Sequence, residues 1–183
     1  MTEFEILNQL IKDSAKISPK NENGKVSVTL NEPQTQDSSV VIVGIPPDAV
    51  IIKVDVFHSP DAIFSGSKGE CKRADYVIVA DSNGEKHILY IEMKKTKDSL
   101  KEVIQQLTGA RCFLRYCQEI GKSFWDDKNF LNDYQQKFVS IGHTSIPKRK
   151  TRVLRRSAKH DTPENVMKID WPHRLQFNRL VGA

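Results

Sequence analysis

The chain has 183 residues, of which 38% are hydrophobic and 28% charged, and its formal net charge is +5. This balance is typical of a soluble folded domain and not of an intrinsically disordered chain. No apolar run approaches the roughly 20 residues that span a bilayer, and the first residues lack a signal-peptide pattern. We therefore expect a cytoplasmic protein without a membrane segment, folded as one domain over residues 1–183.

The cysteines and histidines argue against two common kinds of site. Cys71, Cys112 and Cys117 show no Cys-x-x-Cys spacing, which disfavours a disulfide framework and a structural zinc site. The five histidines are scattered, with no pair at metal-ligand spacing. Ordinary surface or packing roles are expected for them.

Two helices are predicted from capping residues and apolar spacing. The first is predicted over residues 2–16, with Thr2 as N-cap and Glu5 three positions later, which is a capping box. Ser99 and Glu102 repeat this pattern at the start of a long amphipathic helix. Gly121 is expected to end that helix as its C-cap.

Strands are predicted before and after the long helix in the sequence. Apolar and alternating segments indicate strands at residues 25–30, 39–45, 49–57, 73–79, 88–94 and 137–141. The two strands around Asn83-Gly84 are apolar on both faces, as expected in the middle of a covered sheet. The pattern predicts a mixed α/β fold, with its core at about 40–145 and a basic extension at 146–183.

The register of the predicted hairpin brings charged residues together. Asn83-Gly84 is the sequence signal for a two-residue type I′ turn. Counting back from that turn places Asp75 opposite Glu92 and Arg73 opposite Lys94. Because side chains alternate along a strand, Asp75, Glu92 and Lys94 share one face.

Two carboxylates in this position need a neutralising partner, since like charges opposite each other destabilise a sheet. A divalent cation between Asp75 and Glu92 would neutralise them, and Lys94 would then hold an attacking water. The register thus predicts a site for metal-dependent hydrolysis. The alternative is a surface ion-pair arrangement in which Asp75 pairs with Lys94 and Glu92 with Arg73.

Asp75 followed by Glu92-Met93-Lys94 resembles the PD-(D/E)xK nuclease superfamily, over roughly residues 68–120. Ala74 stands where that motif has proline. The resemblance implies a restriction-endonuclease-like core, a central mixed sheet flanked by helices with its acids at strand ends. Asp61 follows a proline in the chain, but its surroundings indicate a loop, so it ranks second to Asp75.

The resemblance also implies a Mg²⁺ or Mn²⁺ cofactor. Mg²⁺ prefers oxygen ligands, which Asp75, Glu92 and the backbone carbonyl of Met93 supply. Gln106, in a Gln-Leu pair on the inner flank of the long helix, is expected to assist the metal or a phosphate. Its alternative is a glutamine that merely flanks the core, and Gln105 is expected to face solvent.

Basic residues near the motif and in the extension are candidate DNA contacts. Lys72 and Arg73 are expected to bind phosphates, and Glu70 is a possible additional acid if its loop folds inward. Residues 148–160 contain seven Lys or Arg in thirteen positions, which suits a polyanion or, equally, a solvated segment. The candidates there are Lys148, Arg149, Lys150, Arg152, Arg155 and Arg156.

The first functional hypothesis is a Mg²⁺-dependent deoxyribonuclease, an endonuclease in a restriction, repair or antiviral defence system. The second is a nuclease-like fold without catalysis that serves as a nucleic-acid-binding or assembly module. The third is an RNA-directed nuclease. So small a core has little room for its own sequence-reading module, so a homodimer partner, a companion NTPase or a targeting protein is expected.

Overall fold

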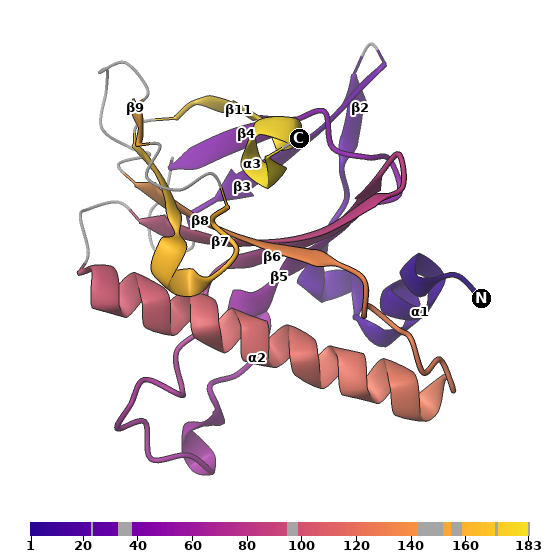
Figure 1. Cartoon of the computed structure of the whole chain (residues 1–183), viewed down its shortest axis with the longest axis vertical. Helices are drawn as coiled ribbons and strands as arrows, with labels where there is room; N and C mark the ends of the chain where they lie inside the picture. The colour runs from indigo at the N-terminus through magenta and orange to yellow at the C-terminus, as the bar shows by residue number, and fades with distance from the viewer. Residues whose placement is uncertain are drawn as a thin grey trace.

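The structure, a computed structural model, describes residues 1–22, 24–32, 38–94, 99–142, 152–154, 159–170 and 172–182. Its elements form three layers (Figure 1): helices α1 and α2, a central sheet, and a second sheet with the short helix α3. Both sheets contain parallel and antiparallel pairs. The mixed α/β class is therefore confirmed.

The central sheet has seven strands and the second sheet four. In sheet order the central strands are β1 (Lys16–Ile17), β5 (Val50–Lys53), β6 (Tyr76–Ser82), β7 (Glu85–Lys94), β8 (Gln135–Gly142), β10 (Met167–Asp170) and β9 (Arg152–Leu154). The second sheet is ordered β11 (Arg174–Gln176), β4 (Ser39–Val43), β3 (Lys25–Asn31) and β2 (Lys20–Glu22).

Three α-helices and four 3₁₀ turns are present in the described ranges. The helices are α1 (Glu3–Leu10), α2 (Leu100–Phe124) and α3 (Phe177–Val181). The turns are η1 (Asp13–Ala15), η2 (Val54–Val56), η3 (Pro60–Ala62) and η4 (Pro163–Asn165). None of these helices is long and apolar enough to cross a membrane.

The predicted hairpin between β6 and β7 is confirmed. Asn83 and Gly84 have φ angles of 57° and 88°, as a type I′ turn requires. Ser82 pairs with Glu85, and the pairing keeps the same register back to Tyr76, the first residue of β6. β7 then leads through α2 to β8, which lies parallel to it.

The central sheet separates two apolar cores. Val77, Tyr90 and Phe138 pack on the side of α1 and α2, where the Tyr90 and Phe138 rings stack with centroids 4.7 Å apart. Alternate residues such as Ile78 and Leu89 pack on the other side, against the second sheet and α3. The sheet is thus covered by α1 and the long helix α2 on one face and mainly by strands on the other.

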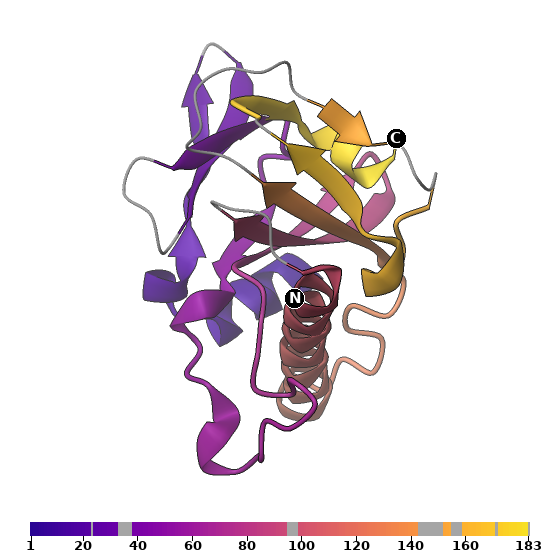
Figure 2. The same cartoon turned by 90° about the vertical axis from the view of Figure 1, so that its left-hand side faces the viewer.

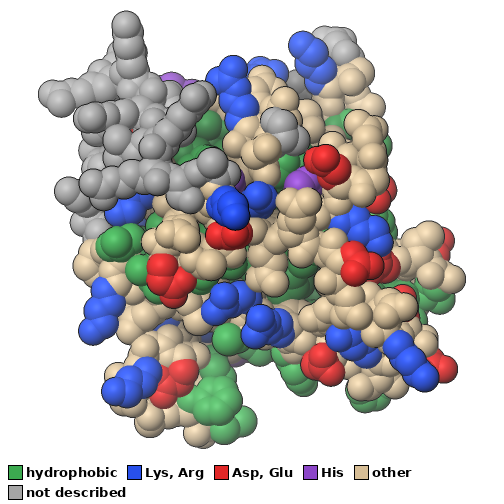
Figure 3. Space-filling model, viewed as in Figure 1, with side chains coloured by type: hydrophobic (Ala, Val, Ile, Leu, Met, Phe, Trp, Pro, Cys, Tyr) green, Lys and Arg blue, Asp and Glu red, His purple; other side chains and the backbone are tan. Residues whose placement is uncertain are grey.

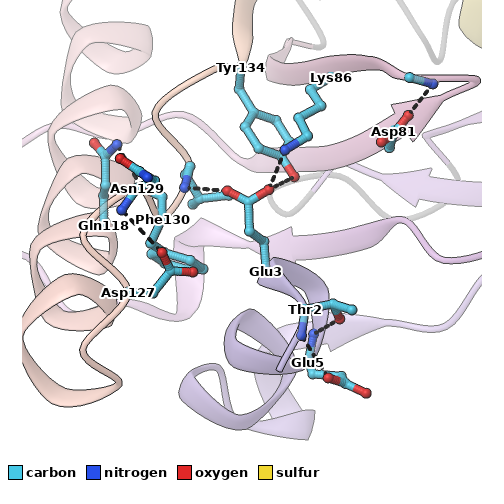
Figure 4. Close-up of polar contacts among 12 residues, drawn as sticks. Thr2, Glu3, Glu5, Asp81, Lys86, Gln118, Asp127, Asn129, Phe130 and Tyr134 are labelled. Carbon is cyan, nitrogen blue, oxygen red and sulfur yellow. Dashed lines mark hydrogen bonds and ion pairs between the residues drawn. The ribbon is translucent and has the colours of Figure 1, made fainter.

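The amino-terminal helix is tied to the sheet through Glu3. Thr2 and Glu5 form the predicted capping box, with the Thr2 amide 2.7 Å from the Glu5 carboxylate. The Glu3 carboxylate pairs with Lys86 at 2.7 Å and accepts a hydrogen bond from the Tyr134 hydroxyl at 3.2 Å (Figure 4). It also accepts one from the Leu131 amide at 2.8 Å.

Several predicted element ends were wrong. The first helix, predicted over residues 2–16, ends at Leu10, and η1 and β1 follow it. The strand predicted over 49–57 stops at Lys53, because the chain turns into η2 there. Gly121 does not cap α2: the helix continues to Phe124, and Gly121 is instead the place where Phe130 packs. A Cβ on Gly121 would lie 2.2 Å from the Phe130 ring, so a close side-chain contact requires this glycine.

Candidate active site

The predicted acid pair lies on the side of the central sheet that α2 covers. Val77 and Tyr90 pack in the core on the helix side, and side chains alternate along each strand. Asp75 and Glu92, two positions farther along, therefore point to that same side. Tyr76, the first residue of β6, pairs with Ile91, so one position earlier this register places Asp75 opposite Glu92.

Hydrogen bonds join Asp75 to β7 and to η2, which directly follows β5. Its carboxylate accepts a hydrogen bond from the Met93 amide at 2.7 Å, and its carbonyl accepts one from the Val54 amide at 2.8 Å. The N–H and C=O of one strand residue point to the same side of the strand. The Met93 carbonyl therefore lies on the Asp75 side of β7, which fits its predicted role as a metal ligand.

Glu92 and Lys94 form a buried ion pair. The Lys94 ammonium lies 3.0 Å from the Glu92 carboxylate, and the Glu92 side chain is 1% exposed. This pair lies along one strand and differs from both diagonal pairs of the alternative interpretation. The charges therefore belong to a largely buried site and not to a solvated surface arrangement.

Arg73 does not take the position that the register alone predicts. Its guanidinium donates hydrogen bonds to the carbonyls of Val54 and Cys71, at 3.3 and 3.4 Å, and lies over the Phe57 ring. β6 begins only at Tyr76, so the strand pairing that would place Arg73 across from Lys94 has already ended. The predicted phosphate position between these two cations is not formed.

The environment of Asp75 brings the pKa of its carboxyl group close to neutral pH. Burial raises the pKa of Asp75 to about 7, against the opposite effects of the Met93 hydrogen bond and the Lys94 charge. The carboxylates of Asp55 and Glu32 raise this pKa further. A divalent cation at this position would displace the proton and favour the ionised form.

Asp55 and Glu32 were missed as neighbours of the site. Glu32 follows β3 of the second sheet and is 5% exposed, and one Asp55 oxygen is buried without a hydrogen-bond partner. Their positions in the sequence do not indicate that they lie near Asp75, because only tertiary packing brings these carboxylates close to it. Within the described part of the chain, no three His, Cys, Asp or Glu side chains converge as a metal site.

The two glutamines of α2 have different environments. The Gln106 side-chain oxygen is buried without a hydrogen-bond partner, next to the core residue Leu107. Gln105 was predicted to face solvent, but its amide donates to the Lys68 carbonyl at 2.8 Å and packs against Gly69. Gln105 therefore holds the preceding loop in place, whereas the side-chain oxygen of Gln106 accepts no hydrogen bond.

The loop of residues 57–72 carries the remaining candidates near the motif. Lys72 forms an ion pair with Glu102 at 2.9 Å. Glu70 does not fold inward: it is exposed, and its carboxylate accepts hydrogen bonds from the Lys68 amide at 2.7 Å and from Ser65 at 3.2 Å. Backbone hydrogen bonds, from its own amide and that of Lys68, lower the Glu70 pKa. Glu70 is thus part of the loop structure and does not join the acid pair.

The structure describes only some of the remaining predicted site residues. Asp61 lies in η3, in the exposed part of the loop. Arg152 begins β9, and its side chain is not described. The other candidates of the basic segment lie outside the described residues: Lys148, Arg149, Lys150, Arg155 and Arg156.

The site and the loop of residues 57–72 lie on the same side of the molecule. Figures 1 and 2 show this loop, the first turn of α2 and the end of β7 together on that side. In the view of Figure 3, acidic and basic side chains are interspersed over α2, while apolar side chains gather on the lobe below it. That lobe includes the exposed side chains of Ile63 and Phe64.

Two cavities elsewhere in the described ranges do not include the acid pair. One of about 210 Å³ lies between α1, β1 and β5, and another of about 130 Å³ lies beside the carboxyl-terminal half of α2.

Comparison of the chain with protein-family models, with curated proteins and with solved structures gives no match. Functional inference therefore rests on the residues themselves.

Proposed function

We propose that the protein is a Mg²⁺- or Mn²⁺-dependent phosphodiesterase that cleaves DNA. One observation carries this proposal: Asp75, Glu92 and Lys94 lie on one face at the end of a central hairpin. The Met93 amide joins the Asp75 carboxylate to the Glu92-Met93-Lys94 segment at 2.7 Å. A two-acid, one-lysine group with a backbone carbonyl beside it provides the ligands and the cation that phosphoryl hydrolysis uses.

Each residue has a distinct chemical role in this proposal. Asp75, Glu92 and the Met93 carbonyl would hold the metal ion through oxygen atoms. When bound, the ion would supply a water of lowered pKa and neutralise charge on the phosphate. Lys94, whose ammonium lies 3.0 Å from the Glu92 carboxylate, would stabilise the negative charge of the transition state. Gln106, whose side-chain oxygen is buried without a hydrogen-bond partner, would supply a further polar group to the site.

The proposal extends to the fold family and the context. The mixed sheet, the order β6–β7–α2–β8 and the acids at the strand ends support a restriction-endonuclease-like core. The second sheet, which covers the face opposite α2, is an addition to the helix-flanked sheet that the resemblance implies. A role in restriction, repair or antiviral defence, with a dimer or targeting partner, rests on family analogy alone.

A catalytically inactive module is the second candidate, and the Lys94–Glu92 ion pair favours it. In this pair the lysine neutralises one carboxylate without a cation. A raised pKa allows Asp75 to carry a proton near neutrality, which neutralises the other. The same residues are then stable without any metal ion, as a purely structural polar group would be.

Cleavage of supercoiled plasmid with Mg²⁺ or Mn²⁺ tests the two candidates. Glu92→Ala and Lys94→Ala should each abolish cleavage, whereas Glu85→Ala, an exposed change in the same hairpin, should retain it. Cleavage that survives both site substitutions would assign the activity elsewhere. Absence of cleavage on any nucleic acid, together with absence of metal binding by calorimetry, would support the module. Single-stranded DNA, duplex DNA and RNA substrates tested side by side decide the substrate class.

A further inference from the structure

The polar row that contains the acid pair continues across two more strands. In the parallel pairing of β7 with β8, Glu92 lies opposite Ser140. In the parallel pairing of β8 with β10, Ser140 lies opposite Lys168. The row therefore runs from Asp75 through Glu92 and Ser140 to Lys168, across four adjacent strands of the central sheet.

Ser140 and Lys168 point to the same side of the sheet as the acid pair. Phe138, two positions before Ser140, packs in the core on the helix side. Ile169, next to Lys168, packs in the opposite core. Because side chains alternate along a strand, Ser140 and Lys168 both face the side that α2 covers. Both are partly exposed there.

On the direct line from Glu92 to Lys168, β8 contributes only the small side chain of Ser140. The row beyond Ser140 has Lys94 on β7, Gly142 on β8 and Asp170 on β10. A Cβ on Gly142 would lie 2.7 Å from an Asp170 carboxylate oxygen, so the space above this glycine is occupied from β10. After Phe138, β8 contributes to this face only the serine hydroxymethyl group of Ser140 and Gly142.

The spacing of the strands sets the reach of Lys168. Adjacent strands lie about 4.8 Å apart, so the backbones of Glu92 and Lys168 are about 10 Å apart. A lysine side chain is long and flexible and carries a point charge that binds phosphate. We propose that Lys168 binds a phosphate next to the one that is cleaved at the acid pair. This inference rests on the proposed function and adds a substrate-binding residue to it.

If Lys168 binds a phosphate, it makes an ionic contact with the DNA backbone. Such a contact makes the affinity for DNA depend on salt concentration. Each phosphate contact contributes about one unit to the slope of log affinity against log salt concentration. Duplex affinity should be measured by fluorescence anisotropy over a range of salt concentrations, on a Glu92→Ala background that cannot cleave. Cleavage kinetics should be measured in the otherwise unaltered protein.

Lys168→Gln should weaken duplex affinity about 3- to 10-fold and reduce the salt slope by about one. It should raise KM, with kcat changed less than about twofold, because it removes a binding contact. Lys168→Arg should retain the slope. Lys128→Gln, an exposed change in the loop after α2, is the matched control and should change none of these values. Circular dichroism should show that all three variants are folded.

Two results would overturn the inference while leaving the proposed function intact. One is a salt slope for Lys168→Gln equal to that of Lys128→Gln. The other is a loss of kcat at unchanged KM, which would assign Lys168 to the chemical step. If the unaltered protein neither binds nor cleaves any nucleic acid, the proposed function fails first and the inference fails with it.

Discussion

Gly109 brings α2 into contact with the backbone carbonyl of Lys72. A Cβ built on Gly109 would lie 1.7 Å from that oxygen and 2.7 Å from the carbonyl carbon. Asp75 follows Lys72 by three residues, and its carboxylate accepts a hydrogen bond from the Met93 amide. The glycine therefore sets how closely the helix packs against the segment that positions the acid pair.

Replacement of this glycine should destabilise the protein even though alanine favours helices. Gly109→Ala should gain about 1 kcal/mol of helix propensity, but the clash with fixed backbone should outweigh it and leave a net loss of about 1–3 kcal/mol. The free energy of unfolding in urea measures this. Thr108→Ala, on the preceding position of the same helix, should be neutral or stabilising. Equal stability of the two variants would contradict the packing argument.

The two glutamines of α2 should separate stability from function. Gln106→Leu removes a buried oxygen that has no hydrogen-bond partner, so it should leave stability unchanged or raise it by up to about 1 kcal/mol. Plasmid cleavage should nevertheless fall at least tenfold if this oxygen serves the site. Gln105→Leu should instead lower stability by about 1 kcal/mol, because it loses the bond to the Lys68 carbonyl. Full activity in Gln106→Leu would show that this glutamine only flanks the core.

Glu3 should be the most important acidic residue of the amino-terminal helix. Its carboxylate joins Lys86, Tyr134 and the Leu131 amide (Figure 4). Glu3→Ala should lower the free energy of unfolding by about 1–3 kcal/mol, because three partly buried partners lose their bonds. Glu119→Ala, which removes one exposed ion pair, should change it by less than about 0.5 kcal/mol. Thermal or urea unfolding of both variants provides the comparison.

His87 should make the fold sensitive to acid. Its side chain is 2% exposed, and neither ring nitrogen has a hydrogen-bond partner. Burial lowers the pKa of His87 below its ordinary value, although Glu85 acts in the opposite direction. Between the lowered pKa and about 6.5 the unfolded chain binds more protons than the folded one, so stability falls as the pH falls below about 6.5.

The variant His87→Leu should reduce this loss of stability between pH 7 and pH 5. Part of the loss should remain, because burial also lowers the pKa of His160. His173→Leu replaces an exposed histidine and should keep the original pH dependence. Urea unfolding at a series of pH values measures the effect. An unchanged pH profile in His87→Leu would assign the acid sensitivity to other groups.

Local patterns were sufficient to predict the hairpin and its acid pair. The Asn83-Gly84 turn fixes the register, and strand alternation then fixes the face of Asp75 and Glu92. The start of α2 was predictable for a similar reason, since Ser99 caps the helix through a bond to Glu102 three residues later. These features depend on residues close in sequence, whose geometry is set by backbone sterics and hydrogen bonds.

Features that depend on distant segments were not predictable. The second sheet joins β11 to β4 across more than 130 residues of chain, and no local pattern indicates such a pairing. The alignment of Lys168 with Glu92 likewise requires two successive parallel pairings through β8. Arg73 was misplaced because burial and nearby carbonyls, rather than strand register, decide its direction.

The sequence by itself determined which chemical groups meet at the hairpin, because a two-residue turn leaves only one register for the strands that follow it. The tertiary structure alone decided the surroundings of those groups: the carboxylates of Asp55 and Glu32, the contact between Gly109 and Lys72, and the row that ends at Lys168. These depend on packing between segments far apart in the chain, where burial and close contact act without any local sequence pattern.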